Sequence, residues 1–140
     1  VYTFIIIIVI ILVTLLILLR RKKYSNKHNY FVFNKKNNKF YYNSKPVVTL
    51  ESLEEKILIF LFQNKDRYTQ LNELNVFFES EHKDNYSLIV KRRDLLFNSL
   101  LFKLSSLMNI EISHVVIKQK NEIDKRIREI RLNPLYFKSK

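Results

Sequence analysis

Residues 91–108 read KRRDLLFNSLLFKLSSLM and carry side chains that could bind an anionic polymer. Lys91, Arg92 and Arg93 open the segment, and Asn98 and Ser99 follow within about two helical turns. Lysine and arginine contact phosphates, arginine also pairs with guanine, and asparagine pairs with adenine. Cations at a helix N-terminus oppose the helix dipole at a cost of about 0.3 kcal/mol or more each. Because this placement is unfavourable for stability, it favours a functional role for these cations. A merely solvated helix start is the alternative interpretation.

The same segment has the apolar spacing of a long helix over about residues 88–108, which Ser87 could cap. One broad face is predicted to pack against a core, with Arg93 reaching its rim. That face holds Ile89, Arg93, Leu96, Phe97, Leu100, Leu104 and Leu107. The opposite face holds Lys91, Arg92, Leu95, Asn98, Ser99, Phe102 and Ser106. The sequence therefore predicts a helix that buries its leucines and presents its cationic end outward.

Two shorter helices are predicted to precede this one. In TLESLEEKILIFLFQN, Ser52 and Glu55 have capping-box spacing, and apolar residues then recur at helical spacing. After a break at NKDRYT, Thr69 could cap a second short helix, QLNELNVFFES.

Two β-hairpins are predicted to flank the helices. YFVF (30–33) and KFYY (39–42) are separated by NKKNN, in which asparagine can adopt the left-handed conformation that a turn needs. A disordered lysine–asparagine linker is the alternative, although disordered segments are usually poor in aromatic residues. ISHVVIK (112–118) and IREIRL (127–132) have strand patterns, and Pro134 is expected to end the second.

The hairpin after the long helix has a basic tip. Its cations are Lys118, Lys120, Lys125, Arg126 and Arg128, set against Glu122 and Asp124. Such a hairpin could contact the DNA backbone or the minor groove, whereas a charged tip is also what any solvated turn has. The sequence does not decide between the two interpretations.

The N-terminus is an uncharged run of 18 residues, YTFIIIIVIILVTLLILL (2–19). At about 1.5 Å per residue, a helix of this length nearly crosses the ~30 Å of bilayer hydrocarbon. A buried strand, an aggregating segment and a signal peptide are weaker alternatives, since no basic segment precedes the run and no small-residue cleavage site follows it. The sequence predicts a transmembrane helix over 1–19, a basic juxtamembrane linker over 20–28 and a folded domain over 29–140.

A cationic flank follows the apolar run directly. It consists of Arg20, Arg21, Lys22 and Lys23, which are expected at the membrane surface. Because such flanks remain in the cytoplasm, we expect a single-pass bacterial inner-membrane protein with its N-terminus outside and its C-terminal domain inside. The first residue is valine, which suggests a longer protein with an extracytoplasmic sensor region upstream of residue 1. A valine start codon is the alternative.

Charge and composition narrow the function further. Residues 20–48 hold nine of the 25 cations and none of the 13 acids, so the remainder of the chain has 16 cations against 13 acids. The net charge of +12 therefore belongs mainly to residues 20–48, and a bias toward AT-rich codons also contributes lysine and asparagine. There is no cysteine and no glycine, which excludes disulfides, a P-loop and a nucleophile elbow. His28, His82 and His114 lie far apart, so no metal, no cofactor and no enzymatic activity is expected.

Three helices followed by a β-hairpin form the winged helix-turn-helix arrangement, and the preceding hairpin makes the resemblance more specific. The stretch from YFVF to LNVFF resembles the start of an OmpR/PhoB-type winged-helix effector domain, with Lys45, Pro46 and Val47 leading into the first helix. Leu100, Lys103 and Leu104 match the spacing of the pattern that ends the family's third helix. EIDKRIREIRLN also resembles the C-terminal end of winged-helix proteins of Bacteroidetes. The family usually has glycine in the wing and more arginine on the recognition helix, and this chain lacks both.

The fold class expected is therefore α+β: an N-terminal transmembrane helix, then a winged helix-turn-helix domain with an N-terminal β-hairpin, three helices and a C-terminal hairpin wing. The resemblance implies a membrane-anchored transcription regulator that binds double-stranded DNA. Helix 88–108 would enter the major groove, and the basic linker would lie on the anionic inner leaflet. A homodimer on paired half-sites would raise a modest affinity.

Two other functions stay open from the sequence. A tethered winged helix could bind a protein instead of DNA, and helix 88–108 could lie on lipid. Leu95 and Phe102 discriminate between DNA and protein, because an exposed apolar pair on the outer face favours a protein partner.

Overall fold

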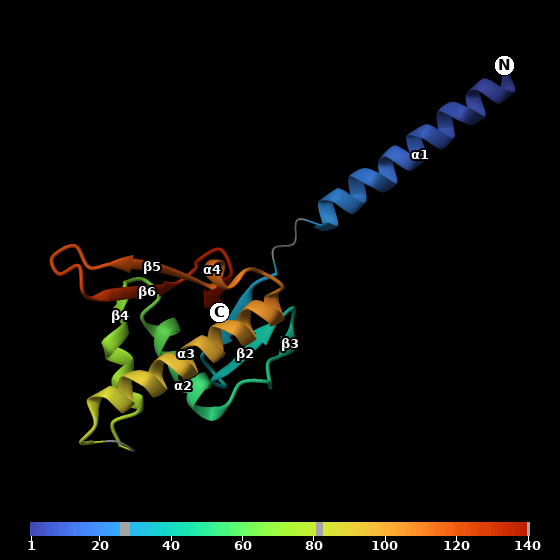
Figure 1. The fold of residues 1–140 in the computed structure, drawn as a ribbon. Helices are drawn as coiled ribbons and strands as arrows, with labels where there is room; N and C mark the ends of the chain where they lie inside the picture. The colour runs from blue at the N-terminus through green and yellow to red at the C-terminus, as the bar shows by residue number, and fades with distance from the viewer. Residues whose placement is uncertain (26–28, 81–82, 140) are drawn as a thin grey trace.

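The computed structural model describes residues 1–25, 29–80 and 83–139, and within them the chain is a mixed α+β protein with an apolar N-terminal helix (Figure 1). The helices are α1 (Tyr2–Ser25), α2 (Ser52–Gln63), the 3-10 helix η1 (Leu71–Phe77), α3 (Tyr86–Met108) and the short α4 (Ile112–Val115). The strands are β1 (Phe31–Asn34), β2 (Lys39–Tyr42), β3 (Lys45–Pro46), β4 (Thr69–Gln70), β5 (Val116–Lys120), β6 (Arg128–Leu132) and β7 (Phe137–Ser139).

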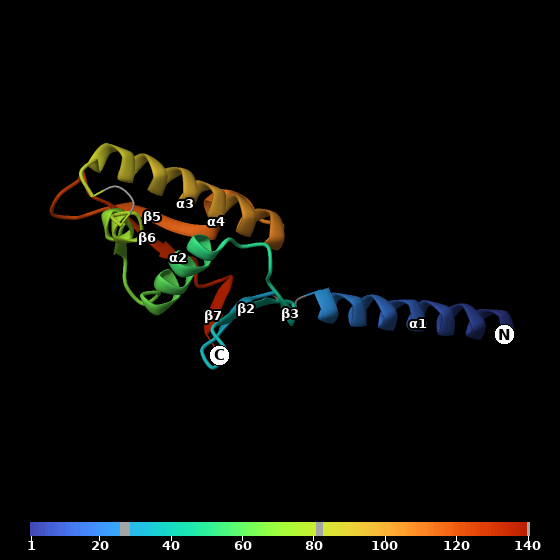
Figure 2. The same cartoon turned by 90° about the horizontal axis from the view of Figure 1, so that it is seen from below.

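Helix α1 exposes an apolar surface on every side. Its stretch Tyr2–Arg20 has a mean hydropathy of 3.3 and no buried residue, and the helix projects away from the rest of the chain (Figure 1, Figure 2). A helix that is apolar all round needs an apolar environment. By length and composition α1 could therefore cross a membrane or act as a signal sequence.

The N-terminal β-hairpin is confirmed. Strands β1 and β2 pair antiparallel, with Phe31 opposite Tyr42 and Asn34 opposite Lys39. Asn38 closes the turn with a φ of 54°, as expected of a chain that must use asparagine where others use glycine.

The hairpin belongs to a larger sheet that the sequence did not reveal. Its strand order is β3-β2-β1-β7, and β7 at the far end of the chain pairs parallel with β1. Phenylalanine rings from these strands pack around Phe62 of α2, with ring centroids 5.5 Å from Phe40 and 5.6 Å from Phe33 and Phe137. This aromatic cluster fixes the sheet on α2.

Helix α2 begins where the sequence predicts but uses a different cap. Glu51 is the N-cap residue, and its backbone N–H donates to Oε2 of Glu54 at 3.0 Å. The predicted pair of Ser52 and Glu55 is wrong by one residue, because the pattern of polar residues in this stretch fits either register.

The second helix is also shorter than predicted. It is the 3-10 helix η1, and its N-cap is Gln70, whose N–H donates to Glu73 at 2.9 Å. Thr69 is not the cap: it lies buried in β4, paired with Ile130 of β6.

Helix α3 is the longest helix of the folded part. Its N-cap is Asn85 rather than Ser87, since the Asn85 side chain accepts from the N–H of Leu88 at 3.1 Å. It ends at Asn109 in the left-handed conformation, with a φ of 52°, again in the absence of glycine.

The C-terminal hairpin is confirmed in part. Strands β5 and β6 pair antiparallel from Val116 opposite Leu132 to Lys120 opposite Arg128, and β4 adds a third strand beside β6. Residues 112–115, predicted as strand, form the helical turn α4 instead. Strand β6 ends at Leu132, shortly before Pro134, as expected.

Figure 2 shows how these elements are layered. The sheet of β1, β2, β3 and β7 lies on one side, α2 lies in the middle, and α3 lies on the opposite side with the β5–β6 hairpin beside it. The outer surface of α3 therefore points away from the sheet of β1, β2, β3 and β7.

Candidate nucleic-acid interface

The outer face of α3 is the first part of the site. The inner face buries a row of residues: Ile89, Arg93, Phe97, Leu100, Leu101, Leu104 and Met108. The outer face exposes the opposite row, as the sequence predicts: Lys91, Arg92, Leu95, Asn98, Ser99, Phe102 and Ser106. We call this second row the α3 outer face. Leu95 and Phe102 are 63% and 62% exposed. They therefore form an exposed apolar pair, which is the outcome expected for a protein partner.

Helix α3 is held on α2 by a buried carboxylate that sequence reasoning missed. Glu54 is 1% exposed and accepts from Lys103 Nζ at 2.8 Å and from the Ser99 hydroxyl at 3.0 Å. Burial raises the pKa of Glu54, but hydrogen bonds from Lys103, the Glu51 N–H and Ser99 outweigh it, so the pKa is lowered overall. The Ser99 hydroxyl therefore helps to position α3 on α2, and its predicted role as a DNA contact stays a prediction.

Arg93 likewise serves the fold rather than the surface. It is 7% exposed, its Nη1 donates to Asn75 of η1 at 3.0 Å, and its Nη2 lies 2.7 Å from Asp94. This network ties α3 to η1. Arg93 thus lies on the inner face, as predicted, with internal partners for its guanidinium, and its predicted DNA contact stays a prediction. Asn75 in the preceding helix gave no sequence signal for this contact.

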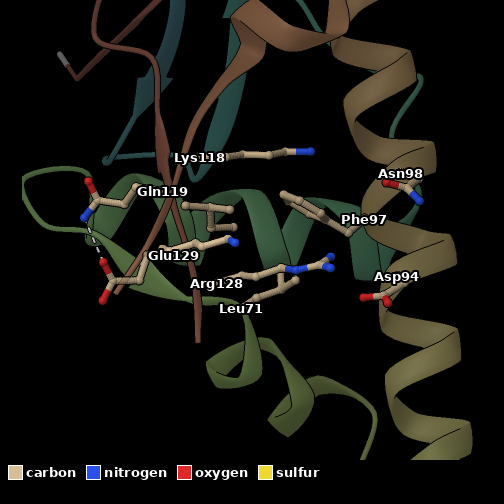
Figure 3. Close-up of a pocket in the computed structure, with 10 residues that line it drawn as sticks. Leu71, Asp94, Phe97, Asn98, Lys118, Gln119, Arg128 and Glu129 are labelled. Carbon is tan, nitrogen blue, oxygen red and sulfur yellow. Dashed lines mark hydrogen bonds between the residues drawn. The ribbon is translucent and has the colours of Figure 1, made fainter. Parts of the chain in front are cut away.

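The β5–β6 hairpin supplies the second part of the site. Residues alternate between the two faces of a strand, and the register pairs Lys118 with Ile130 and Lys120 with Arg128. These four residues share the face turned toward α3. Figure 3 shows Lys118 and Arg128 extending toward the side of α3 that carries Asp94 and Asn98. Gln119 and Glu129 lie on the other face.

An open groove of about 410 Å³ separates the hairpin from α3. Its lining includes Lys118, Lys120 and Arg128 from the hairpin and Asp94, Phe97 and Asn98 from α3. Glu129 also belongs to its lining, so three cations stand against two carboxylates, of which Asp94 is ion-paired with Arg93. Three of the predicted hairpin cations thus face the helix that the sequence singled out.

The loop end of the β5–β6 hairpin is ordered by a carboxylate on the face away from α3. Glu129 accepts from Gln119 Nε2 at 2.8 Å and from Asn121 Nδ2 at 2.6 Å, and these two hydrogen bonds lower its pKa. The Asn121 side chain also accepts from the backbone N–H groups of Ile123 and Asp124. Asparagine therefore shapes this turn in a chain that has no glycine.

Two of the predicted DNA contacts lie at the tip of the hairpin, and their environments differ. Lys125 is exposed. Arg126 is also exposed, but its guanidinium pairs with Asp124 at 3.0 Å, and this hydrogen bond raises the pKa of Arg126 and lowers that of Asp124. Much of the charge of Arg126 is therefore compensated within the turn.

The predicted membrane-surface group is described only at its start. Arg20 is exposed at the end of the apolar stretch. The side chains of Arg21, Lys22 and Lys23, and the linker residues 26–28, lie outside the described residues.

Metal chemistry has no support in the part of the chain that the structure describes, where no group of three or more His, Cys, Asp and Glu side chains could hold an ion. His114 is exposed on α4, whereas His28 and His82 lie outside the described residues. The predicted absence of an enzymatic activity stays a prediction.

No protein-family model matches the chain, and comparisons with curated proteins and with solved structures give no significant match. The site must therefore be interpreted from its own geometry.

Proposed function

We propose that residues 29–140 form a winged helix-turn-helix domain that binds double-stranded DNA, anchored to a membrane by α1. The observation that carries the proposal is the convergence of two cationic groups on one face. Lys91 and Arg92 lie at the start of the α3 outer face, and Lys118, Lys120 and Arg128 line the groove beside it. In this arrangement α2, η1 and α3 correspond to the three helices and β5–β6 to the wing, with the departure that the second helix is a short 3-10 helix.

Electrostatics favour a polyanion as the ligand of this face. Two of the acids nearest to it are ion-paired within the protein, Asp94 with Arg93 and Asp124 with Arg126, whereas Glu129 is hydrogen-bonded to the neutral amides of Gln119 and Asn121 and keeps its charge. The five cations named above and Lys125 would supply about four to six phosphate contacts, which gives a modest and strongly salt-dependent affinity. Helix α3 would enter the major groove, and the hairpin would follow the backbone or the minor groove.

The membrane tether agrees with the layering of the folded part. We propose that α1 spans the inner membrane with the N-terminus outside, and that Arg20 to Lys23 lie on the anionic inner leaflet, at up to about 1 kcal/mol per cation. The sheet that follows the linker lies on the side of the folded part opposite to α3 (Figure 2). A tether on that side would leave the α3 outer face open to DNA.

The test is DNA binding by the full chain in nanodiscs of zwitterionic lipid. Mixed genomic duplex fragments are titrated across a salt series, with fluorescence anisotropy as the readout. We expect log K to fall with log[salt] with a slope of about −4 to −5. A Lys91→Ala/Arg92→Ala variant should bind more weakly with a slope closer to zero, whereas Lys35→Ala/Lys36→Ala, which removes the same charge from the β1–β2 turn, should bind as the wild type does. Absence of binding at low salt by folded protein would contradict the proposal.

A second candidate function has an observation in its favour. The exposure of Leu95 and Phe102 is the outcome that favours a protein partner over DNA. The cations on both sides of the pair argue for DNA instead, because an apolar protein interface is depleted of charge at its core. Failure of DNA binding together with retention of a protein partner that Leu95→Ala releases would establish this second candidate.

A further inference from the structure

Leu95, Asn98 and Phe102 form a short row along the middle of the α3 outer face. Their spacing of three and four residues places them on one side of the helix. Burial does not explain the two apolar members, since both are more than half exposed. Their neighbours along the helix are Lys91, Arg92, the acid Asp94, which is paired with Arg93, and serines, so two exposed apolar side chains flank Asn98 on an otherwise polar surface.

The length of the row matches the spacing of bases. Leu95 and Phe102 are seven residues apart, which is about 10 Å along a helix axis. Stacked base pairs are about 3.4 Å apart, so the row spans about three base-pair steps. Asn98 lies between the two apolar residues, at the height of the intervening base pairs.

We propose that this row makes the domain selective for A·T-rich duplex DNA, with Leu95 and Phe102 packing on thymine C5-methyl groups and the Asn98 amide pairing with adenine. The thymine methyl is the apolar group on the major-groove edge of the base pairs, and asparagine pairs with N6 and N7 of adenine. The inference rests on the proposed DNA-binding function and specifies the sequence class that the site would take.

The surroundings of the row favour duplex DNA as its occupant. Lys91 and Arg92 lie one turn before Leu95, and Lys118 and Lys120 lie across the groove from Asn98. Cations on both sides of an apolar strip fit a ligand whose phosphates flank its apolar groups, and the major groove of DNA has that arrangement. A protein partner would need acids at both flanks and an apolar centre.

The experiment removes the methyl groups without removing the hydrogen bonds. One A·T-rich duplex pool is amplified with dTTP and, separately, with dUTP, because uracil differs from thymine only by the C5-methyl. The full chain in zwitterionic nanodiscs is titrated with each pool at the same salt concentration. We expect the uracil pool to bind more weakly by about fourfold for each thymine methyl on which the row packs.

Matched variants assign the effect to the row. Leu95→Ala and Phe102→Ala should each lower affinity for the thymine pool and reduce the ratio between the two pools. Val76→Ala, which removes an exposed apolar residue from η1, should leave both affinities unchanged.

The outcomes separate this inference from the function on which it rests. Equal binding of the two pools, both strongly salt-dependent, would overturn the thymine contact and leave DNA binding intact. Absence of binding to either pool would overturn DNA binding itself and the inference with it.

Discussion

The two faces of α3 carry the same kinds of residue in opposite environments. Leu100 on the inner face is fully buried, and Phe97 is 4% exposed, whereas Leu95 and Phe102 on the outer face are more than 60% exposed. The inner residues contribute to stability because folding removes them from water. The outer residues remain mostly exposed, so folding removes little of their surface from water. We therefore expect substitutions on the inner face of α3 to lower stability and substitutions on the outer face to leave it largely unchanged.

The largest expected effect is a core truncation on the inner face. Leu100→Ala should lower the free energy of unfolding by about 3 kcal/mol, because it removes buried methyl groups and leaves a cavity. Leu95→Ala, the matched change on the outer face, should lower it by about 0.5 kcal/mol or less. Urea unfolding in neutral detergent, followed by tyrosine fluorescence, measures both. Similar losses for the two variants would mean that the outer face is part of the core.

The next effect concerns the buried carboxylate that joins α3 to α2. Glu54→Gln should destabilise the protein by about 2 kcal/mol near neutral pH, because the charged hydrogen bond from Lys103 is weakened. Glu55→Gln, one residue further on, serves as the control and should have little effect.

The same carboxylate predicts a pH dependence with a definite sign. The pKa of Glu54 is lowered on folding, so its contribution is fully present above the ordinary glutamate pKa and is lost as the pH falls through the lowered value. Unfolding free energies measured from about pH 7 to about pH 3 should therefore decline more steeply for the wild type than for Glu54→Gln. Parallel curves for the two proteins would refute this assignment.

A smaller effect is expected from the hairpin cations that face the groove. Lys118→Ala/Lys120→Ala should leave stability unchanged and reduce the magnitude of the salt slope of DNA binding by about 1.8, since each phosphate contact contributes about 0.9. An unchanged slope would remove the β5–β6 hairpin from the interface.

The smallest effect is expected at the hairpin tip. Because Arg126 pairs with Asp124, Arg126→Ala should change the salt slope less than Lys125→Ala does. The same salt series measures both single variants. A larger change for Arg126 would indicate that its pairing with Asp124 breaks when DNA binds.

Local patterns predicted the elements better than their ends. The β1–β2 hairpin and the long helix follow from aromatic runs, asparagine turns and leucine spacing, which act over a few residues. The caps were less accurate: Glu51, Gln70 and Asn85 took the roles expected of Ser52, Thr69 and Ser87. Polar residues cluster at each helix start, and tertiary packing decides which of them becomes the cap.

Distant contacts could not be predicted in this way. Strand β7 is three residues long and exists because β1, about a hundred residues earlier, offers it an edge. The sequence placed Arg93 on the inner face, but its contact with Asn75 could not be predicted because Asn75 belongs to another helix, and the same holds for the contact of Ser99 with Glu54. By contrast, the outward direction of Lys91 and Asn98 followed from helical periodicity alone.

The most direct test is whether DNA covers the α3 outer face. The chain has no cysteine, so an Asn98→Cys variant carries one thiol at the centre of that face. Its alkylation rate is measured in nanodiscs at low salt with and without duplex DNA, beside a Lys36→Cys variant in the β1–β2 turn. We predict that DNA slows alkylation at position 98, that salt restores it, and that position 36 is unaffected. Unchanged alkylation at position 98 under conditions in which DNA is bound would show that the contact lies elsewhere.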